Sequence, residues 1–184
     1  MPRLATYGQR LAVVAILVMV IWVVEGVNVL LGHRLNLFGI YPRSLAGLSG
    51  IVLAPVLHVN PAHALANTVP LLVLGWLVSL HGRARFIRVA VVVSLLTGSA
   101  VWLFARSAYH VGASGLVFGL FGYVLGRAWW ERSWPAILSA AAAVALYGGL
   151  VWGIVPARAV SFESHLFGLL AGVAMAWFER GRRR

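Results

Sequence analysis

Apolar stretches of helical length, separated by more polar connectors, form the main pattern of this chain. To within a few residues they cover 11–31, 62–80, 86–104, 114–130, 134–155 and 164–178. Each approaches the ~20 residues that an α-helix needs to cross the hydrocarbon core of a bilayer. The first stretch is also too long, and ends too polar, to be a signal peptide. The pattern therefore predicts an all-α polytopic membrane protein, with six transmembrane helices in one domain over residues 1–184.

The connector between the first two predicted helices, residues 32–61, is long and apolar. It contains Pro42 and Pro55, which interrupt helices, together with Gly47 and Gly50. Non-helical backbone is tolerated at membrane depth only where protein shields it from lipid. We expect this connector to lie partly in the membrane interface and to pack against the rest of the protein.

The composition supports membrane insertion and argues against nucleic acid as a partner. Of the 184 residues, 61% are hydrophobic, and the formal net charge is +11. A soluble domain of this length could not bury so much apolar surface, so the lipid bilayer is the expected surrounding. The basic residues lie between and beyond the apolar stretches, as the positive-inside rule requires, which explains the charge without nucleic-acid binding.

The arginines are divided unevenly between the two sides of a six-helix arrangement. One side holds Arg3, Arg10, Arg83, Arg85, Arg88, Arg127, Arg132, Arg180, Arg182, Arg183 and Arg184. The other side holds Arg34, Arg43, Arg106 and Arg158. Cytoplasmic loops carry the excess of basic residues, so both termini are predicted to be cytoplasmic. The composition, rich in Ala, Val and Arg and without Lys, suggests a bacterial cytoplasmic membrane.

Polar groups gather at the outer ends of three predicted helices. The second helix begins with "HVNPAHALAN", the fourth with "VGASG" and the sixth with "SFESHLFG". In this topology all three helices begin at the outer face, and their polar side chains lie at one depth. Polar residues in a membrane are costly and usually mark function. The three groups are therefore predicted to form one site.

Ser114 and His165 provide a candidate nucleophile and a candidate base. A serine hydroxyl needs a general base, and histidine titrates near neutral pH. Small residues allow close helix packing, and here they provide a reason for the two helices to meet. They are Gly115, Gly119, Gly122 and Gly126 on the fourth helix, and Gly168 and Gly172 on the sixth. The alternatives are that Ser114 serves packing only and that His165 is a buried histidine bonded to a backbone carbonyl.

An acyl-transfer site also needs hydrogen-bond donors for the developing oxyanion. His63 and Asn67 are four residues apart, hence on one face of the second helix, and both carry N–H donors. The backbone N–H of Ser114, at the positive end of its helix, is a further candidate. The structural alternative is that His63 and Asn67 are interhelical hydrogen-bonding residues. His58 is expected to brace the loop that enters the second helix.

Several other chemistries are excluded or disfavoured. The chain has no cysteine, so a thiol nucleophile and a cysteine-ligated metal are excluded. No HExxH motif occurs, and all four acidic residues are glutamates, which excludes a pair of catalytic aspartates. We expect no metal and no cofactor. Glu163, two residues before His165, is expected to be a solvated loop residue, and His110 is expected to lie at the interface.

Together these motifs resemble the rhomboid family of intramembrane serine proteases, over roughly residues 47–177. The resemblance implies a compact six-helix bundle with a Ser-His dyad, in which Ser114 is the nucleophile and His165 the base. It also assigns supporting roles to further residues. These are His63 and Asn67 as oxyanion donors, Gly112 and Gly115 in shaping the turn, and Phe118 in stacking on the histidine.

The sequence departs from the family pattern in the first loop. The Trp-Arg pair of many relatives is absent, and "GIYPRSLAG" stands there instead. With no soluble domain before the first helix and no seventh helix, the chain is expected to be the minimal bacterial form. The resemblance implies single-pass transmembrane proteins as substrates. The alternative function is a non-catalytic relative that binds or escorts membrane clients; a small transporter fits less well, because no inverted repeat is visible.

Overall fold

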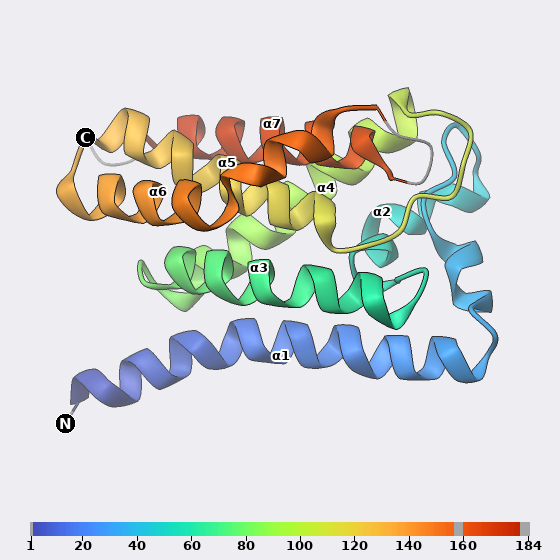
Figure 1. Ribbon diagram of the computed structural model, residues 1–184, viewed down its shortest axis with the longest axis horizontal. Coiled ribbons are helices and arrows are strands. Elements are labelled where there is room, and N and C mark those ends of the chain that lie inside the picture. The colour runs from blue at the N-terminus through green and yellow to red at the C-terminus, as the bar shows by residue number, and fades with distance from the viewer. Residues whose placement is uncertain (1, 157–159, 181–184) are drawn as a thin grey trace.

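Helices make up most of the computed structural model, which describes residues 2–156 and 160–180. The long helices are α1 (Pro2–Leu30), α3 (Pro61–Ser79), α4 (Arg83–Phe104), α5 (Ser114–Glu131), α6 (Trp134–Tyr147) and α7 (Phe162–Arg180). A 3₁₀-helix, η4 (Gly148–Ile154), continues α6. No β-strand occurs in the described ranges, and the helices form one bundle (Figure 1). The predicted fold class is confirmed.

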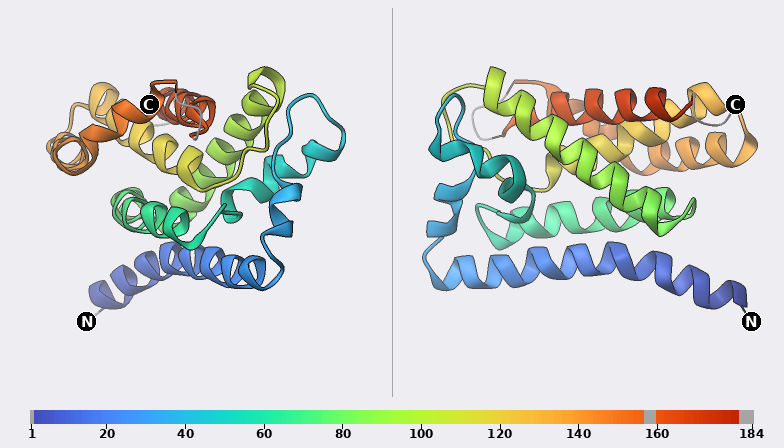
Figure 2. Two further views of the ribbon diagram at one scale, coloured as in Figure 1. Left: turned by 45° about the vertical axis from the view of Figure 1, so that its right-hand side comes forward. Right: turned by 180° about the vertical axis from the view of Figure 1, so that it is seen from behind.

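The direction of the helices can be followed from one end of the bundle to the other. α1 begins and α7 ends at one end of the bundle, whereas α3, α5 and α7 all begin at the other end (Figures 1 and 2). Within the described residues, four stretches are long and apolar enough to span a membrane. They are Gly8–Leu30, Pro61–Ser79, Arg83–Phe104 and Trp134–Ile154. The glycine-rich α5 is central, since it packs against α3, α4, α6 and α7 and most of its residues are buried.

The contact between α5 and α7 is made largely by main-chain atoms. A Cβ added to Gly168 would collide with the carbonyl oxygen of Gly115, and one added to Gly172 would collide with that of Gly119. No larger residue fits at either position without separating the helices. The predicted close packing through small residues is therefore confirmed, and it fixes the beginning of α5 beside the beginning of α7.

The long first connector is built from short helical segments and is not an open loop. These are η1 (Arg34–Phe38), η2 (Ala46–Leu48), α2 (Gly50–Leu53) and η3 (Ala54–Val56). Gly47 and Gly50 permit its close backbone approaches, because a Cβ on either would collide with the main chain of residues 39–41. Leu45 and Val52 are exposed on its surface, as expected for a segment that meets the membrane interface.

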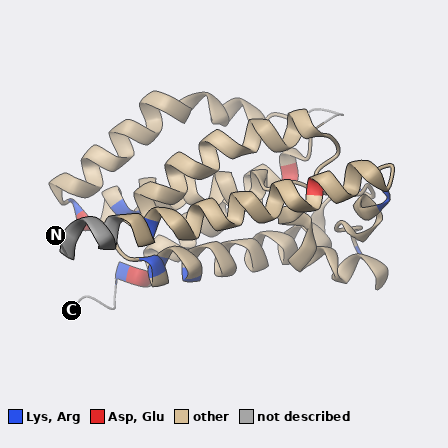
Figure 3. Cartoon of the chain, turned by 90° about the horizontal axis from the view of Figure 1, so that it is seen from below, with Lys and Arg blue, Asp and Glu red and all other residues tan. Residues whose placement is uncertain are grey.

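Charged residues are most frequent at the end where α1 begins and α7 ends (Figure 3). There, Glu179 accepts a hydrogen bond from the Tyr123 hydroxyl (2.6 Å) and faces Arg85 at 3.4 Å. Arg127 pairs with Glu131 and donates to His81 Nδ1 (2.8 Å). Burial, with help from Arg127, lowers the pKa of His81, so its ring is a neutral acceptor. These contacts tie α4, α5 and α7 together at the end remote from Ser114.

Candidate active site

A cavity of about 460 Å³ lies among the beginnings of α3, α5 and α7 and the 3₁₀-helix η4. It is lined by residues from all four elements, including Leu150 of η4. The candidate residues in its wall are His63, Asn67, Ser114, Phe118 and His165. Side chains that are up to 102 positions apart in the sequence thus share one cavity, at the end of the bundle where the polar groups were predicted to meet.

The turn before Ser114 depends on a glycine. Gly112 has a φ of 120°, which L side chains rarely adopt, and a Cβ there would lie 2.6 Å from His63 Cε1. Its N–H donates to the Ala54 carbonyl (2.9 Å), which ties the turn to the first connector. Gly112 therefore provides both the backbone conformation of the turn and the space that the His63 ring occupies.

His58 holds the same turn from within the protein. Its ring is fully buried, and Nε2 accepts a hydrogen bond from the Ala113 N–H (3.3 Å). Burial, with a smaller contribution from His63, lowers the pKa of His58 to about 4, so the ring is neutral and its Nε2 can accept at physiological pH. The His58 carbonyl accepts from Asn28 Nδ2 (3.0 Å). Besides the loop that enters α3, His58 thus contacts the residue next to Ser114, which the sequence did not indicate.

His165 is held on one face and at one ring nitrogen. Its imidazole stacks on Phe118, with ring centroids 4.2 Å apart and planes inclined by 7°. Its Nδ1 lies 2.8 Å from the Gly153 carbonyl oxygen. Because a carbonyl can only accept, Nδ1 carries the proton, and Nε2 has the free lone pair that a general base requires.

Ser114 and His165 lie on the two helices that pack most closely, but their side chains are not hydrogen-bonded in the described structure. Both line the cavity, Ser114 half-buried and His165 8% exposed. Catalytic hydrogen bonds are often long in the absence of substrate and shorten in the Michaelis complex. The structure thus places the two groups in one cavity without a hydrogen bond between their side chains.

Three donors on two helices are available on the serine side of the cavity. Asn67 is buried, and its Nδ2 donates one hydrogen bond to the His63 carbonyl (3.2 Å), which leaves the second amide N–H. The His63 ring meets His58 edge to face, at a centroid distance of 5.0 Å. The Ser114 N–H is in the first turn of α5, where backbone donors have no partner within the helix. N–H groups of this kind can stabilise the oxyanion of a tetrahedral intermediate.

One sequence prediction about the neighbouring loops was wrong. Glu163 is not a solvated loop residue, because it is 7% exposed in the first turn of α7 and lies 3.6 Å from Arg106 Nε. His110, which was expected at the membrane interface, is buried within the protein: it is 2% exposed, and its Nδ1 lies 2.5 Å from Ser161 Oγ. The reason is tertiary packing, since the loops that precede α5 and α7 pack on each other. Glu163 also does not hold His165, whose Nδ1 is bonded to the Gly153 carbonyl.

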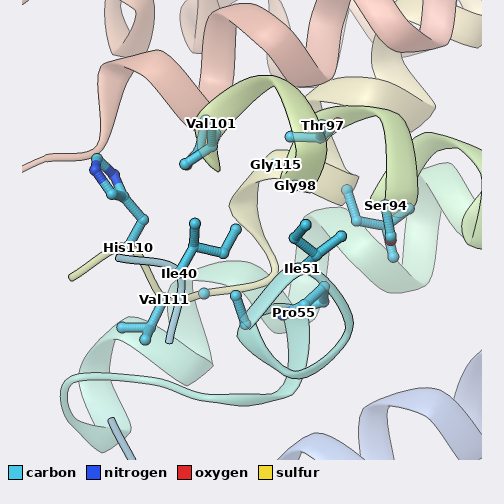
Figure 4. A pocket seen from close by; sticks show the side chains of 14 residues that line it. Ile40, Ile51, Pro55, Ser94, Thr97, Gly98, Val101, His110, Val111 and Gly115 are labelled. Carbon is cyan, nitrogen blue, oxygen red and sulfur yellow. The ribbon is translucent and has the colours of Figure 1, made fainter. Parts of the chain in front are cut away.

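A much smaller cavity lies beside the beginning of α5, where Val111, Gly115 and His110 face it (Figure 4). Its volume is about 30 Å³, and its wall also includes Gly112 and Thr97. This space admits about one or two water molecules and excludes a peptide. Of the two cavities beside the Ser114 turn, only the larger has room for a polypeptide segment. Among the described residues, no group of His, Cys, Asp or Glu is arranged to hold a metal ion.

Comparisons with known proteins identify the family of the chain. A family model, the rhomboid domain, matches residues 45–182. An uncharacterised protein of Mycobacterium tuberculosis is 36% identical over 170 residues, which cover 87% of this chain and 71% of the relative. A protein of Acanthamoeba polyphaga mimivirus whose name describes it as a rhomboid protein is 32% identical over 125 residues, 62% of this chain and 66% of its own length. The chain therefore belongs to the rhomboid family.

Proposed function

We propose that this protein is an intramembrane serine peptidase that hydrolyses a peptide bond in membrane-anchored substrates by a Ser-His dyad. The observation that carries the proposal is the shared cavity, which is lined by Ser114 and by a histidine whose Nδ1 is bonded to a carbonyl, so that its Nε2 is left to accept a proton. Membership of the rhomboid family supports it, since that family is associated with proteolysis within the membrane.

In the proposed reaction, His165 Nε2 removes the proton of the Ser114 hydroxyl as its oxygen attacks the scissile carbonyl. The oxyanion that forms is stabilised by the N–H groups of Asn67, His63 and the Ser114 backbone. The same imidazole then passes the proton to the leaving amine, and an acyl-enzyme remains. Water, activated by His165, hydrolyses the acyl-enzyme and restores the serine.

The proposed substrates are single-pass transmembrane proteins whose helix unwinds locally near the outer face. In an intact helix the carbonyls are hydrogen-bonded and shielded, so an extended segment must reach Ser114. The cavity walls suit such a segment, because Val59 and Leu150 offer apolar contacts beside the polar groups. A peptide backbone that loses its own hydrogen bonds in lipid needs new partners, and the polar end of the cavity supplies them.

A non-catalytic client-binding protein is the second candidate. It is favoured by the size of the cavity and by the absence of a Ser114–His165 hydrogen bond in the described residues. A serine-directed fluorophosphonate probe, incubated with the detergent-purified protein, separates the two functions. The peptidase is expected to become covalently labelled, because the probe reacts with an activated serine. A folded protein that stays unlabelled at all probe concentrations would be a client binder.

Replacing Phe118 with alanine is expected to lower kcat by about 100-fold, because the imidazole loses the ring on which it stacks and small misplacements of a catalytic group have effects of that size. Glu163→Gln is the matched control, since it keeps an acceptor for Arg106 and removes an ion pair that is partly exposed on the arginine side. It should retain most of its turnover. Both variants are measured on one model substrate, with thermal stability followed in parallel. An inactive but folded Glu163→Gln variant, combined with a normal Phe118→Ala variant, would indicate a Ser-His-Glu triad.

We propose that both termini are cytoplasmic and that the site faces the outer side. The arginine distribution supports this orientation, as does the common end at which α1 begins and α7 ends (Figure 1). Fused to the C-terminus, a reporter that is active only in the cytoplasm should be active, and an alkaline-phosphatase-type reporter that needs the outer compartment should be silent. The reverse result would move Ser114 to the cytoplasmic side.

A further inference from the structure

The base of the proposed dyad is bonded to a main-chain carbonyl. His165 Nδ1 lies 2.8 Å from the oxygen of Gly153 in η4, and no carboxylate is bonded to the ring in the described residues. In a Ser-His-Asp triad the acid holds the imidazole in the correct tautomer and orientation. Here the acceptor that takes the place of the acid is the neutral carbonyl oxygen of Gly153, which lies on the neighbouring helix η4.

This acceptor decides which ring nitrogen carries the proton. A neutral imidazole has one protonated and one free nitrogen, and the partner of one nitrogen fixes the state of the other. A proton on Nε2 would turn the nitrogen needed by Ser114 into a donor, and the ring could not act as base. The Gly153 carbonyl removes that possibility as long as it remains next to Nδ1.

The position of the carbonyl requires a glycine. A Cβ on Gly153 would lie 2.8 Å from Phe118 Cζ and 2.9 Å from His165 Nδ1. Both atoms belong to the stacked ring pair, so a side chain at position 153 would push η4 away or tilt the rings. Gly149 is in the same 3₁₀-helix and has open space where its Cβ would be. Gly149 and Gly153 thus differ in the space that is free for a side chain.

The element that carries the acceptor belongs to the least buried of the four apolar spans. In an apolar 18-residue window of Trp134–Ile154 only 11% of residues are buried, against at least 22% in each of the other three spans. η4 is also a 3₁₀-helix, whose hydrogen-bond geometry is poorer than that of an α-helix. Leu150 packs η4 against the core, and Gly153 joins it to His165 of α7 by the hydrogen bond of its carbonyl.

We propose that Gly153 is a positioning residue for the reaction: its carbonyl locks His165 in the Nδ1–H tautomer, so that the base is ready only while η4 is docked on α7. This inference rests on the proposed peptidase function and adds to it a partner for the base. In this arrangement the Gly153 carbonyl takes the place of the acid, and it orients the imidazole without contributing a charge. It also makes the state of the base dependent on the position of η4.

The variants Gly153→Ala and Gly149→Ala test the proposal. Gly153→Ala is expected to lower kcat at least 10-fold with KM changed less than threefold, since the base is disturbed and the substrate-binding walls remain. Gly149→Ala should be within twofold of the wild type in both constants and serves as the control for adding a methyl group to η4. Equal activity of the two variants would overturn the proposal.

The tautomer of His165 can be measured directly, and a merely structural role of Gly153 would leave it unchanged. In protein with ¹⁵N-labelled histidine, the His165 signals are assigned by their loss in His165→Gln, and the shifts distinguish a protonated from a free ring nitrogen. Wild type and Gly149→Ala should show protonated Nδ1 and free Nε2, whereas Gly153→Ala should show the Nε2–H form or a mixture. A wild-type protein with protonated Nε2 would refute the inference even if the Gly153→Ala variant failed to fold.

The outcomes separate this inference from the proposed function. If Ser114→Ala and His165→Gln leave cleavage unchanged, the dyad is wrong, whatever Gly153 does. If both abolish cleavage while Gly153→Ala retains wild-type kcat and the wild-type tautomer, the dyad stands and the positioning role of Gly153 is wrong.

Discussion

Ser114→Ala is expected to lower kcat by roughly 10⁶-fold, which in practice means no detectable cleavage. The serine oxygen forms the bond to the acyl group, and alanine offers no substitute nucleophile. His165→Gln should have an effect of similar size, and the double variant should be little worse than either single one, because residues that act as a unit have strongly non-additive effects. Cleavage of a model single-pass substrate in liposomes measures all three variants.

The control for Ser114→Ala is Ser139→Ala on α6. The Ser139 hydroxyl donates a hydrogen bond to the Pro135 carbonyl of its own helix, and the residue is half-buried and does not line the cavity. This variant should cleave normally and keep its fluorophosphonate label. If Ser114→Ala retained either cleavage or label, the nucleophile would have to be a different residue.

Asn67→Ala is expected to lower kcat by about 10- to 1,000-fold while KM stays nearly constant. The amide supplies one of several donors to the oxyanion, and removal of one such donor has effects of this order. Since the interaction exists only in the transition state, its loss should not weaken substrate binding. Steady-state kinetics on the same substrate give kcat and KM separately.

Thr68→Ala is the matched control for Asn67→Ala. Thr68 is the next residue of α3, but its hydroxyl bonds to the Ala64 carbonyl and to Trp22 of α1, on another face of the helix. Loss of the Thr68 hydroxyl should lower the free energy of unfolding more than it lowers kcat. Unchanged kcat in Asn67→Ala would instead support the alternative that Asn67 only links its helix to its neighbours.

The sequence was sufficient to predict the bundle and the residues that meet in it, because these depend on local patterns. Apolar stretches gave the helices, and the spaced glycines of α5 and α7 indicated which two pack most closely. Ser114, His63, Asn67 and His165 could be grouped because each lies at the beginning of a helix that starts at the same end. Their roles remain predictions until the variants above are measured.

What the sequence did not indicate depends on contacts between distant segments. The alternative for His165, a buried histidine bonded to a backbone carbonyl, describes its contact in the structure. Every residue carries a main-chain oxygen, however, so no sequence pattern indicated that Gly153 is the partner. The stretch 134–155 was predicted as one helix from its apolar composition, whereas the structure changes from α- to 3₁₀-helix at Gly148. Glu163 is buried because Arg106, 57 positions earlier, lies against it.

The change of helix type at Gly148 links the site to the thickness of the bilayer. At 1.5 Å per residue the 14 residues of α6 rise only ~21 Å, less than the ~30 Å of the hydrocarbon core. The seven residues of η4, at ~2 Å each, add ~14 Å, which is more than the ~9 Å that remains. Within this span the 3₁₀-helix has the poorer hydrogen-bond geometry, and it also carries the Gly153 carbonyl. We therefore expect a change in membrane thickness to act on the hydrogen bond between Gly153 and His165 before it separates α5 from α7, whose main chains are in close contact.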